Sequence, residues 1–220
     1  MATVKYRAGT VRVWMADMLF PGLIPKIGNS ARVERTDEEA GDACGANKRG
    51  TVLPPDQLPA IAWSKRAPGT LKLRPYFSLN GWPAVTERGY EVLQGFDLGA
   101  GSLHPLELYE RDRTTPLPGP DGEPARAWVW NLGNVKDTFV PEESPGVSEN
   151  DYVPGIWHAD MGGQADEIAV RPSALEGPDV WVEEHLRGPV FLSGALGDAL
   201  IAAGVGRHMM MQPARLLEAR

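Results

Sequence analysis

Apolar and polar residues alternate with helical spacing most clearly between residues 193 and 204. Apolar side chains recur there on one helix face, at Leu196, Ala199, Leu200 and Ala203. Ser193 is a favourable N-cap because its hydroxyl can accept from a free backbone N–H group, and Gly204 can end the helix in a left-handed turn. We therefore expect a helix here. Short strands should precede it at 179–182 and 189–192, and a strand or strand pair should follow at 207–217.

A second pattern of the same kind lies upstream, where Thr86 aligns with Ser193. Each copy reads as a capped amphipathic helix, a glycine-containing break and a strand with a proline near its middle. The pattern predicts a single α+β domain over residues 1–220, with mixed short β-strands, a few short helices and long irregular loops. Its two helix–strand half-repeats span 57–136 and 168–217. Chance alignment of two ordinary helix–strand units is the alternative.

Shorter apolar runs predict further strands. These runs are 4–7, 10–14, 58–63, 71–76, 103–109, 127–132 and 168–170. A turn-rich segment at 116–124 should close a hairpin between 103–109 and 127–132. Trp128 and Trp130 share one face of the second hairpin strand, and we expect both in the core rather than in a ligand platform.

Two polar segments interrupt this pattern. Residues 29–55 are charged and glycine-rich, and we expect them to form a long loop-rich excursion with Cys44 exposed on it. Residues 140–166 combine acidic and turn-forming residues, which is typical of a long surface connection.

The composition is that of an ordinary globular protein, with 42% hydrophobic and 23% charged residues among 220. No run approaches the roughly 18 apolar residues of a membrane span. The N-terminal residues lack the apolar region of a signal peptide. A single cysteine allows no intrachain disulfide. We therefore expect a cytoplasmic protein.

The net charge of −7 is concentrated in one segment, since residues 137–198 hold 2 Lys or Arg and 13 Asp or Glu. Such a block disfavours a nucleic acid or an anionic membrane and attracts a basic protein surface. The candidate contact residues are Asp160, Asp166, Glu167, Glu183 and Glu184. A solvated acidic face without a partner is the alternative.

Known signatures of catalysis and cofactor binding are missing. The chain has no GxGxxG and no P-loop pattern, and Ser193 lacks the glycine two positions earlier that a nucleophile elbow requires. His104 and His208 occupy similar places in the two half-repeats, which indicates structural positions. We expect no catalytic residue and no cofactor.

A small metal-dependent hydrolase is the alternative enzyme class. His158 and Asp160 could supply two ligands, with further ones from Glu183, Glu184 and His185. The tight spacings that mark metal sites are absent, so no metal site is predicted. The adjacent Glu183 and Glu184 should point apart, which suits a pair of surface charges better than an acid/base couple.

Three motifs carry a resemblance to a known family: Pro178-Asp-Val-Trp181, Phe191-Leu-Ser193 and Leu196-Gly-Asp-Ala-Leu200. The chain resembles the eleventh numbered Imm family, the immunity proteins of bacterial polymorphic toxin systems. Its members show a P-D-[I/V]-W element, an aromatic strand ending in serine and a helix beginning L-x-x-A-L. The resemblance covers roughly residues 58–215 and is most specific near the C-terminus; the segment 29–55 departs from it.

The resemblance implies a cytoplasmic, non-catalytic antidote that acts as a monomer or homodimer. It would bind a cognate protein toxin, encoded nearby, and block its active site or its access to substrate. The motif residues Pro178, Asp179, Trp181 and Ser193 would be structural, with direct toxin contact as the alternative. A non-catalytic interaction subunit of a larger assembly is the third possible function.

Overall fold

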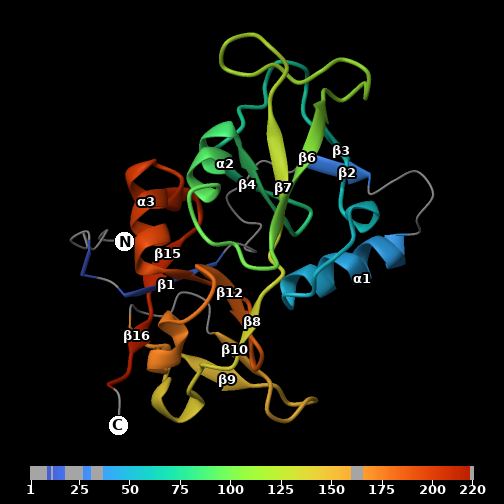
Figure 1. The fold of residues 1–220 in the computed structure, drawn as a ribbon. Coiled ribbons are helices and arrows are strands. Elements are labelled where there is room, and N and C mark those ends of the chain that lie inside the picture. The colour runs from blue at the N-terminus through green and yellow to red at the C-terminus, as the bar shows by residue number, and fades with distance from the viewer. Residues whose placement is uncertain (1–8, 11, 18–26, 31–36, 160–165, 219–220) are drawn as a thin grey trace.

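The structure is a computed structural model that describes residues 9–10, 12–17, 27–30, 37–159 and 166–218. The fold is α+β, as predicted, with three α-helices beside two larger and two smaller sheets in these ranges (Figure 1). None of the described helices is long and apolar enough to cross a membrane. The predicted strand at 4–7 lies outside the described residues.

The first half-repeat builds a mixed six-stranded sheet. Its strands, in spatial order, are β2 (Ile27–Ser30), β3 (Ile61–Ser64), β6 (Ser102–Tyr109), β7 (Ala127–Asn131), β5 (Trp82–Thr86) and β4 (Tyr76–Leu79). The antiparallel pairing of β6 with β7 confirms the predicted hairpin. The sheet curls so that its outermost strands, β2 and β4, contact each other.

The second half-repeat builds a five-stranded sheet together with an upstream strand and the last two residues of the first half-repeat. Its spatial order is β15 (Met211–Pro213), β1 (Val13–Ala16), β14 (Val190–Ser193), β12 (Val180–Glu183) and β8 (Val135–Lys136). Two smaller sheets lie beside it at the lower end of Figure 1. They contain β13 (Leu186–Arg187), β10 (Trp157–Ala159) and β9 (Val147–Glu149), and β11 (Ala169–Val170) with β16 (Arg215–Leu216).

The two larger sheets repeat one local arrangement. In each, the second strand of an antiparallel hairpin leads directly into a helix: β5 into α2 (Glu87–Leu93), and β14 into α3 (Gly194–Ala202). The chain then returns as a strand parallel to the one before the helix, and an antiparallel strand lies between the two. That intervening strand is β7 in the first sheet and β1 in the second.

The helix ends follow the sequence signals to different extents. The hydroxyl of Ser193 accepts from the backbone N–H of Leu196 at 3.2 Å, which confirms the predicted N-cap. Gly204 has a φ of +71°, as a left-handed C-terminal turn requires. Thr86 precedes α2 as predicted, but its side chain makes no capping hydrogen bond.

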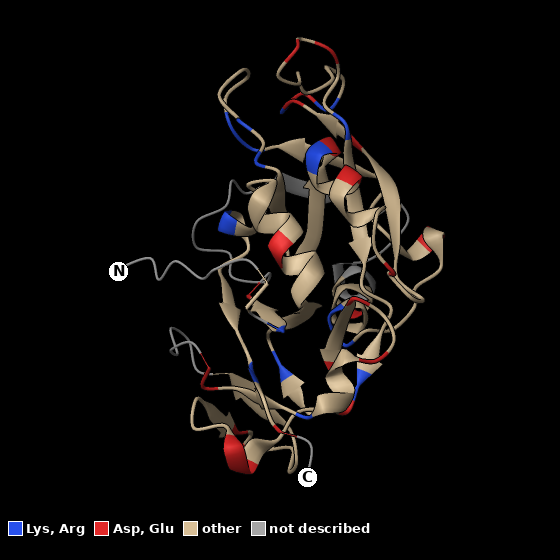
Figure 2. Cartoon of the chain, turned by 60° about the vertical axis from the view of Figure 1, so that its left-hand side comes forward, with Lys and Arg blue, Asp and Glu red and all other residues tan. Residues whose placement is uncertain are grey.

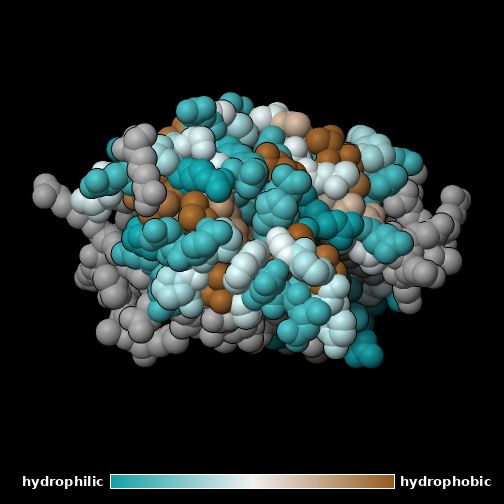
Figure 3. Space-filling model, turned by 90° about the horizontal axis from the view of Figure 1, so that it is seen from below, coloured by the Kyte–Doolittle hydropathy of each residue, from teal (hydrophilic) through white to brown (hydrophobic). Residues whose placement is uncertain are grey.

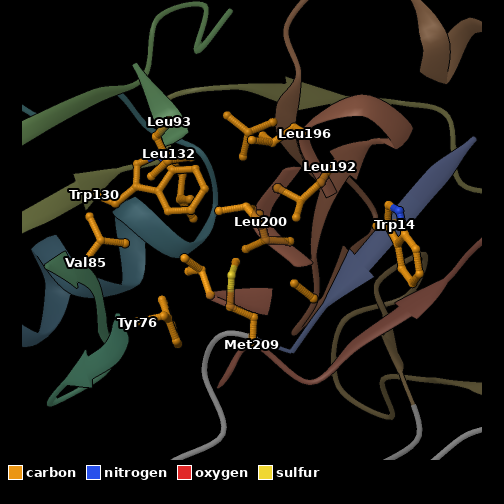
Figure 4. Packing of buried hydrophobic residues seen from close by; sticks show 14 of the residues in the cluster. Trp14, Tyr76, Val85, Leu93, Trp130, Leu132, Leu192, Leu196, Leu200 and Met209 are labelled. Carbon is orange, nitrogen blue, oxygen red and sulfur yellow. The ribbon is translucent and has the colours of Figure 1, made fainter. Parts of the chain in front are cut away.

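The central hydrophobic core joins the two sheets, and α2 packs against α3 within it (Figure 4). The six-stranded sheet supplies Tyr76, Val85 and Trp130, while α3 supplies Leu196 and Leu200. Trp128 also belongs to this cluster, so both hairpin tryptophans are in the core, as predicted. Burial of many such side chains, each worth about 1.5–3 kcal/mol, holds the halves together.

The prediction of a loop at 29–55 with an exposed Cys44 is wrong. Residues Asp37–Lys48 form helix α1, and Cys44 is buried, with 8% of its surface exposed. The helix packs on the other face of the six-stranded sheet through small side chains, including Ala43 and Cys44. Its two glycines and its small apolar residues give little helical signal, so tertiary packing decides its structure.

The predicted strand at 71–76 is also displaced. The strand is β4, which begins at Tyr76 and turns into β5 through Asn80 and Gly81. Both turn residues have positive φ, 49° and 94°. An Asn-Gly pair favours a two-residue turn of this kind. The sequence therefore carries a local signal for this hairpin that the apolar runs alone do not show.

Candidate functional site

The motif tryptophan, Trp181, lies at the centre of a buried cluster. It has no exposed surface, and its ring stacks on that of Phe191 with centroids 5.7 Å apart. The Nζ atom of Lys136 lies 3.8 Å from the Trp181 ring centroid and donates to the carbonyls of Ala174 and Pro178. Desolvation lowers the pKa of Lys136, although the charge of Glu183 opposes this. Trp181 is therefore a core aromatic residue.

Glu183 is not a surface charge, and this part of the sequence prediction is wrong. Its side chain is 1% exposed and accepts hydrogen bonds from the backbone N–H groups of Thr138 at 2.7 Å and Phe139 at 3.0 Å. It also accepts from the Thr138 hydroxyl and from Trp181 Nε1. A carboxylate that is buried and saturated in this way is not available to a toxin. Its neighbour Glu184 is exposed, so the two side chains diverge as predicted.

The remaining motif residues connect the two halves. Asp179 accepts from the backbone N–H of Asp97 at 2.9 Å, and its own N–H donates to the Asp97 carbonyl at 2.8 Å. The Ser193 N–H donates to the Asp179 carbonyl. These bonds join the loop after α2 to the β12–β14 hairpin, and Pro178 contributes the carbonyl that Lys136 contacts. Each motif residue thus has a structural contact in the fold.

Asn134 has a similar connecting role that the sequence analysis missed. Its Nδ2 donates to the carbonyls of Leu98, Leu132 and Val180 at 2.7–3.1 Å, and its Oδ1 accepts from the N–H of Ala100 at 2.9 Å. The buried amide of Asn134 therefore links the end of β7 to the loop after α2 and to β12. The local signal, an asparagine after a glycine in a strand-to-strand connection, indicates a turn but not its distant partners.

The two histidines of the metal-site alternative, His158 and His185, have contacts within the chain. His158 is exposed, and its Nε2 lies 2.9 Å from Asn150 Nδ2, while the exposed His185 contacts the Gly155 carbonyl. Asp160, the proposed second ligand, lies outside the described residues. Within the described ranges, no group of three or more His, Cys, Asp or Glu is arranged to hold a metal ion.

Among its described residues, the second half exposes eight carboxylates in a part of the chain that holds few Lys or Arg. We call the following exposed residues the acidic surface: Asp137, Glu142, Glu143, Glu149, Asp151, Asp166, Glu176 and Glu184. In the part of the chain that the structure describes, Asp137 and Glu143 are the members of this set in ion pairs, with Arg171 and Arg215. Figure 2 shows acidic segments at the lower end of the molecule, and others on its helices and on the loops at its top.

The five predicted contact residues therefore differ in their exposure to solvent. Asp166 and Glu184 belong to the acidic surface, and Glu167 is half-buried beside Gly146. Glu183 is buried, and Asp160 lies outside the described residues. The same end of the molecule, seen in Figure 3, is mainly hydrophilic with small hydrophobic patches.

A separate groove of about 510 Å³ lies over β6 and β7. Half of its lining residues are aromatic or proline, namely Tyr90, Pro105, Tyr109, Pro116, Pro124 and Trp128. Tyr90 and Trp128 stack with ring centroids 4.0 Å apart. The nearby charged groups are engaged within the chain, since Arg126 pairs with Glu87 and Glu107 accepts from the Tyr109 hydroxyl. The charged side chains beside the groove are therefore held by other groups of the chain.

The chain matches no protein-family model and no curated protein. The resemblance to an immunity family therefore stays a prediction from the three C-terminal motifs.

Proposed function

We propose that this chain is a non-catalytic immunity protein, which binds a basic toxin through its acidic surface and neutralises it in the producing cell. The observation that supports this most directly is the charge imbalance of residues 137–198, which hold 13 Asp or Glu but only 2 Lys or Arg. Residues 137–170 contain no Lys or Arg at all, so few cations of the chain neutralise these groups locally. The motif resemblance points to the same class of function.

Binding by this surface would act in two ways. The negative electrostatic potential of the acidic surface would attract a cationic partner and speed its association. Added salt would weaken this attraction. Once bound, the protein would cover the partner's substrate site. If the toxin is a nuclease, the carboxylates would occupy the basic cleft that otherwise receives the phosphate backbone.

The first test is co-expression with the protein encoded by the adjacent gene. We expect rescue of growth, co-purification of a complex and an association rate that falls with ionic strength. Growth arrest in the presence of this chain, with no complex between the purified proteins, would refute the proposal.

A charge-reversal variant tests the surface itself. The double substitution Asp151→Lys with Glu184→Lys should slow association, because it removes two negative charges from the acidic surface and adds two positive ones. The matched control is Glu91→Lys with Glu123→Lys, which makes the same change at exposed positions of the first half. Equal rates for the two variants would place the contact elsewhere.

A further inference from the structure

The loop between β9 and β10 presents the most exposed large hydrophobic side chain among the described residues. Tyr152 is 91% exposed and its neighbour Val153 is 51% exposed. Transfer of an exposed tyrosine ring from water into an apolar pocket lowers the free energy, and its hydroxyl can stay hydrogen-bonded at the rim of the pocket. Two adjacent apolar groups at a protruding turn therefore form a candidate contact point.

Hydrogen bonds hold the backbone of this loop in one conformation. Asn150 Oδ1 accepts from the N–H groups of Tyr152 at 2.8 Å and Val153 at 3.0 Å. Glu149 Oε1 accepts from the N–H of Gly155 at 2.7 Å, and the Asn150 N–H donates to the Ile156 carbonyl at 2.7 Å. A loop that is already ordered loses little conformational entropy on binding.

The base of the loop is fixed to the core of the second half. β10 pairs with β9 on one side and with β13 on the other. The Trp157 ring packs edge-on against the buried ring of Phe139, with centroids 6.5 Å apart. The backbone N–H of Trp157 donates to the His185 carbonyl at 2.8 Å. The tip therefore stands on a supported hairpin.

The charges around the tip identify the kind of partner. Glu149 and Asp151 lie just before Tyr152 in the chain, and Glu184 precedes His185, which contacts the loop at Gly155. An aromatic anchor with an acidic rim is complementary to an apolar pocket with a basic rim. Aromatic residues in such positions carry much of the binding energy in protein interfaces.

We propose that the tip formed by residues 150–154 is the anchor of the toxin interface, with Tyr152 entering a pocket on a basic protein partner. This inference rests on the proposed function and adds the residue on which affinity depends. Val153 packs beside the anchor, and the flanking carboxylates meet the basic rim.

The test measures the affinity of the purified chain for the protein encoded by the adjacent gene. Tyr152→Ala should weaken binding by about thirtyfold or more, as loss of an interface hot spot does. Tyr152→Phe, which keeps the ring, should bind within a few-fold of the unaltered chain. Val153→Ala should weaken binding measurably, whereas Val52→Ala, at a similarly exposed position in the loop after α1, should not.

Asn150→Ala tests whether the held loop conformation matters, because it leaves Tyr152 in place and removes two of the bonds that order the tip. It should weaken binding through a slower association or a faster dissociation, with an unchanged melting temperature. A complex that forms normally with both Tyr152→Ala and Val153→Ala would overturn the anchor and leave the proposed function standing. Failure of the unaltered chain to bind would overturn both.

Discussion

Gly197 in α3 lies against the indole ring of Trp14 in β1, so closely that a Cβ atom on Gly197 would come nearer than 3.0 Å to three atoms of that ring. The Trp14 Nε1 atom also donates to Asp198, the next residue of the helix, at 3.2 Å. The absence of a side chain at one position thus allows the helix to lie directly on the N-terminal strand.

This contact predicts the effect of Gly197→Ala. Helix propensity alone would favour alanine by about 1 kcal/mol. Because the new methyl group would overlap a buried ring, we expect a net loss of about 1–3 kcal/mol, measured by urea unfolding. Gly41→Ala in α1 is the control: nothing lies within 4 Å of the added Cβ, so this variant should gain stability. Equal effects of the two substitutions would contradict the packing.

Glu183 and Glu184 are adjacent but should respond differently to alanine substitution. Removal of the Glu183 carboxylate leaves Trp181 Nε1 and two backbone N–H groups without their buried acceptor. Each such group costs about 1–3 kcal/mol, so Glu183→Ala should lower the unfolding free energy by more than 2 kcal/mol. Glu184→Ala should change it by less than about 0.5 kcal/mol. A mild effect at Glu183 would mean that the carboxylate is not held as described.

Stability should fall with decreasing pH partly because of His104 and His208. Burial lowers the pKa of both imidazoles below the usual 6.5, with the charge of Arg207 adding to the effect at His208. As the pH falls, the two imidazoles therefore bind protons more readily in the unfolded chain than in the folded chain. The stability that the neutral imidazoles supply is lost as the pH falls below about 6.5.

The double variant His104→Gln with His208→Gln should therefore lose less stability between about pH 7 and pH 5 than the unaltered chain. Unfolding in urea at a series of pH values measures this difference. The variant His158→Gln with His185→Gln reports the contribution of the other two histidines. An identical slope for the first variant and the unaltered chain would exclude a role for His104 and His208.

Cys44 should react slowly with thiol reagents in the folded protein. Burial excludes the reagent and raises the pKa of the thiol, although Lys48 lowers it in part. We expect modification at pH 8 to be at least about tenfold slower in native buffer than in denaturant, where the free thiol has its ordinary reactivity. Rapid labelling of the native chain would show that α1 opens readily from the sheet.

Local signals in the sequence identified α3, its cap at Ser193 and the β6–β7 hairpin, because each depends on residues close together in the chain. Burial of Glu183 was not predictable in this way, since its acceptor role depends on Thr138 and Phe139, which are more than forty residues away. Asn134 is comparable: its identity suggests a turn, whereas its distant partners lie on two other segments, at Leu98 and Ala100 and at Val180.

The position of β1 has a consequence for how the chain is made. Its two partner strands are β14 and β15, which end at Ser193 and Pro213. A ribosome therefore synthesises β1 well before its two partner strands, and β1 can pair only after β14 and β15 have emerged. All the strands of the six-stranded sheet have been synthesised once the chain reaches Asn131. The packing of β1 and α3 against its core comes later. On a nascent chain the first sheet can assemble early, and closure of the second sheet around β1 is the last step.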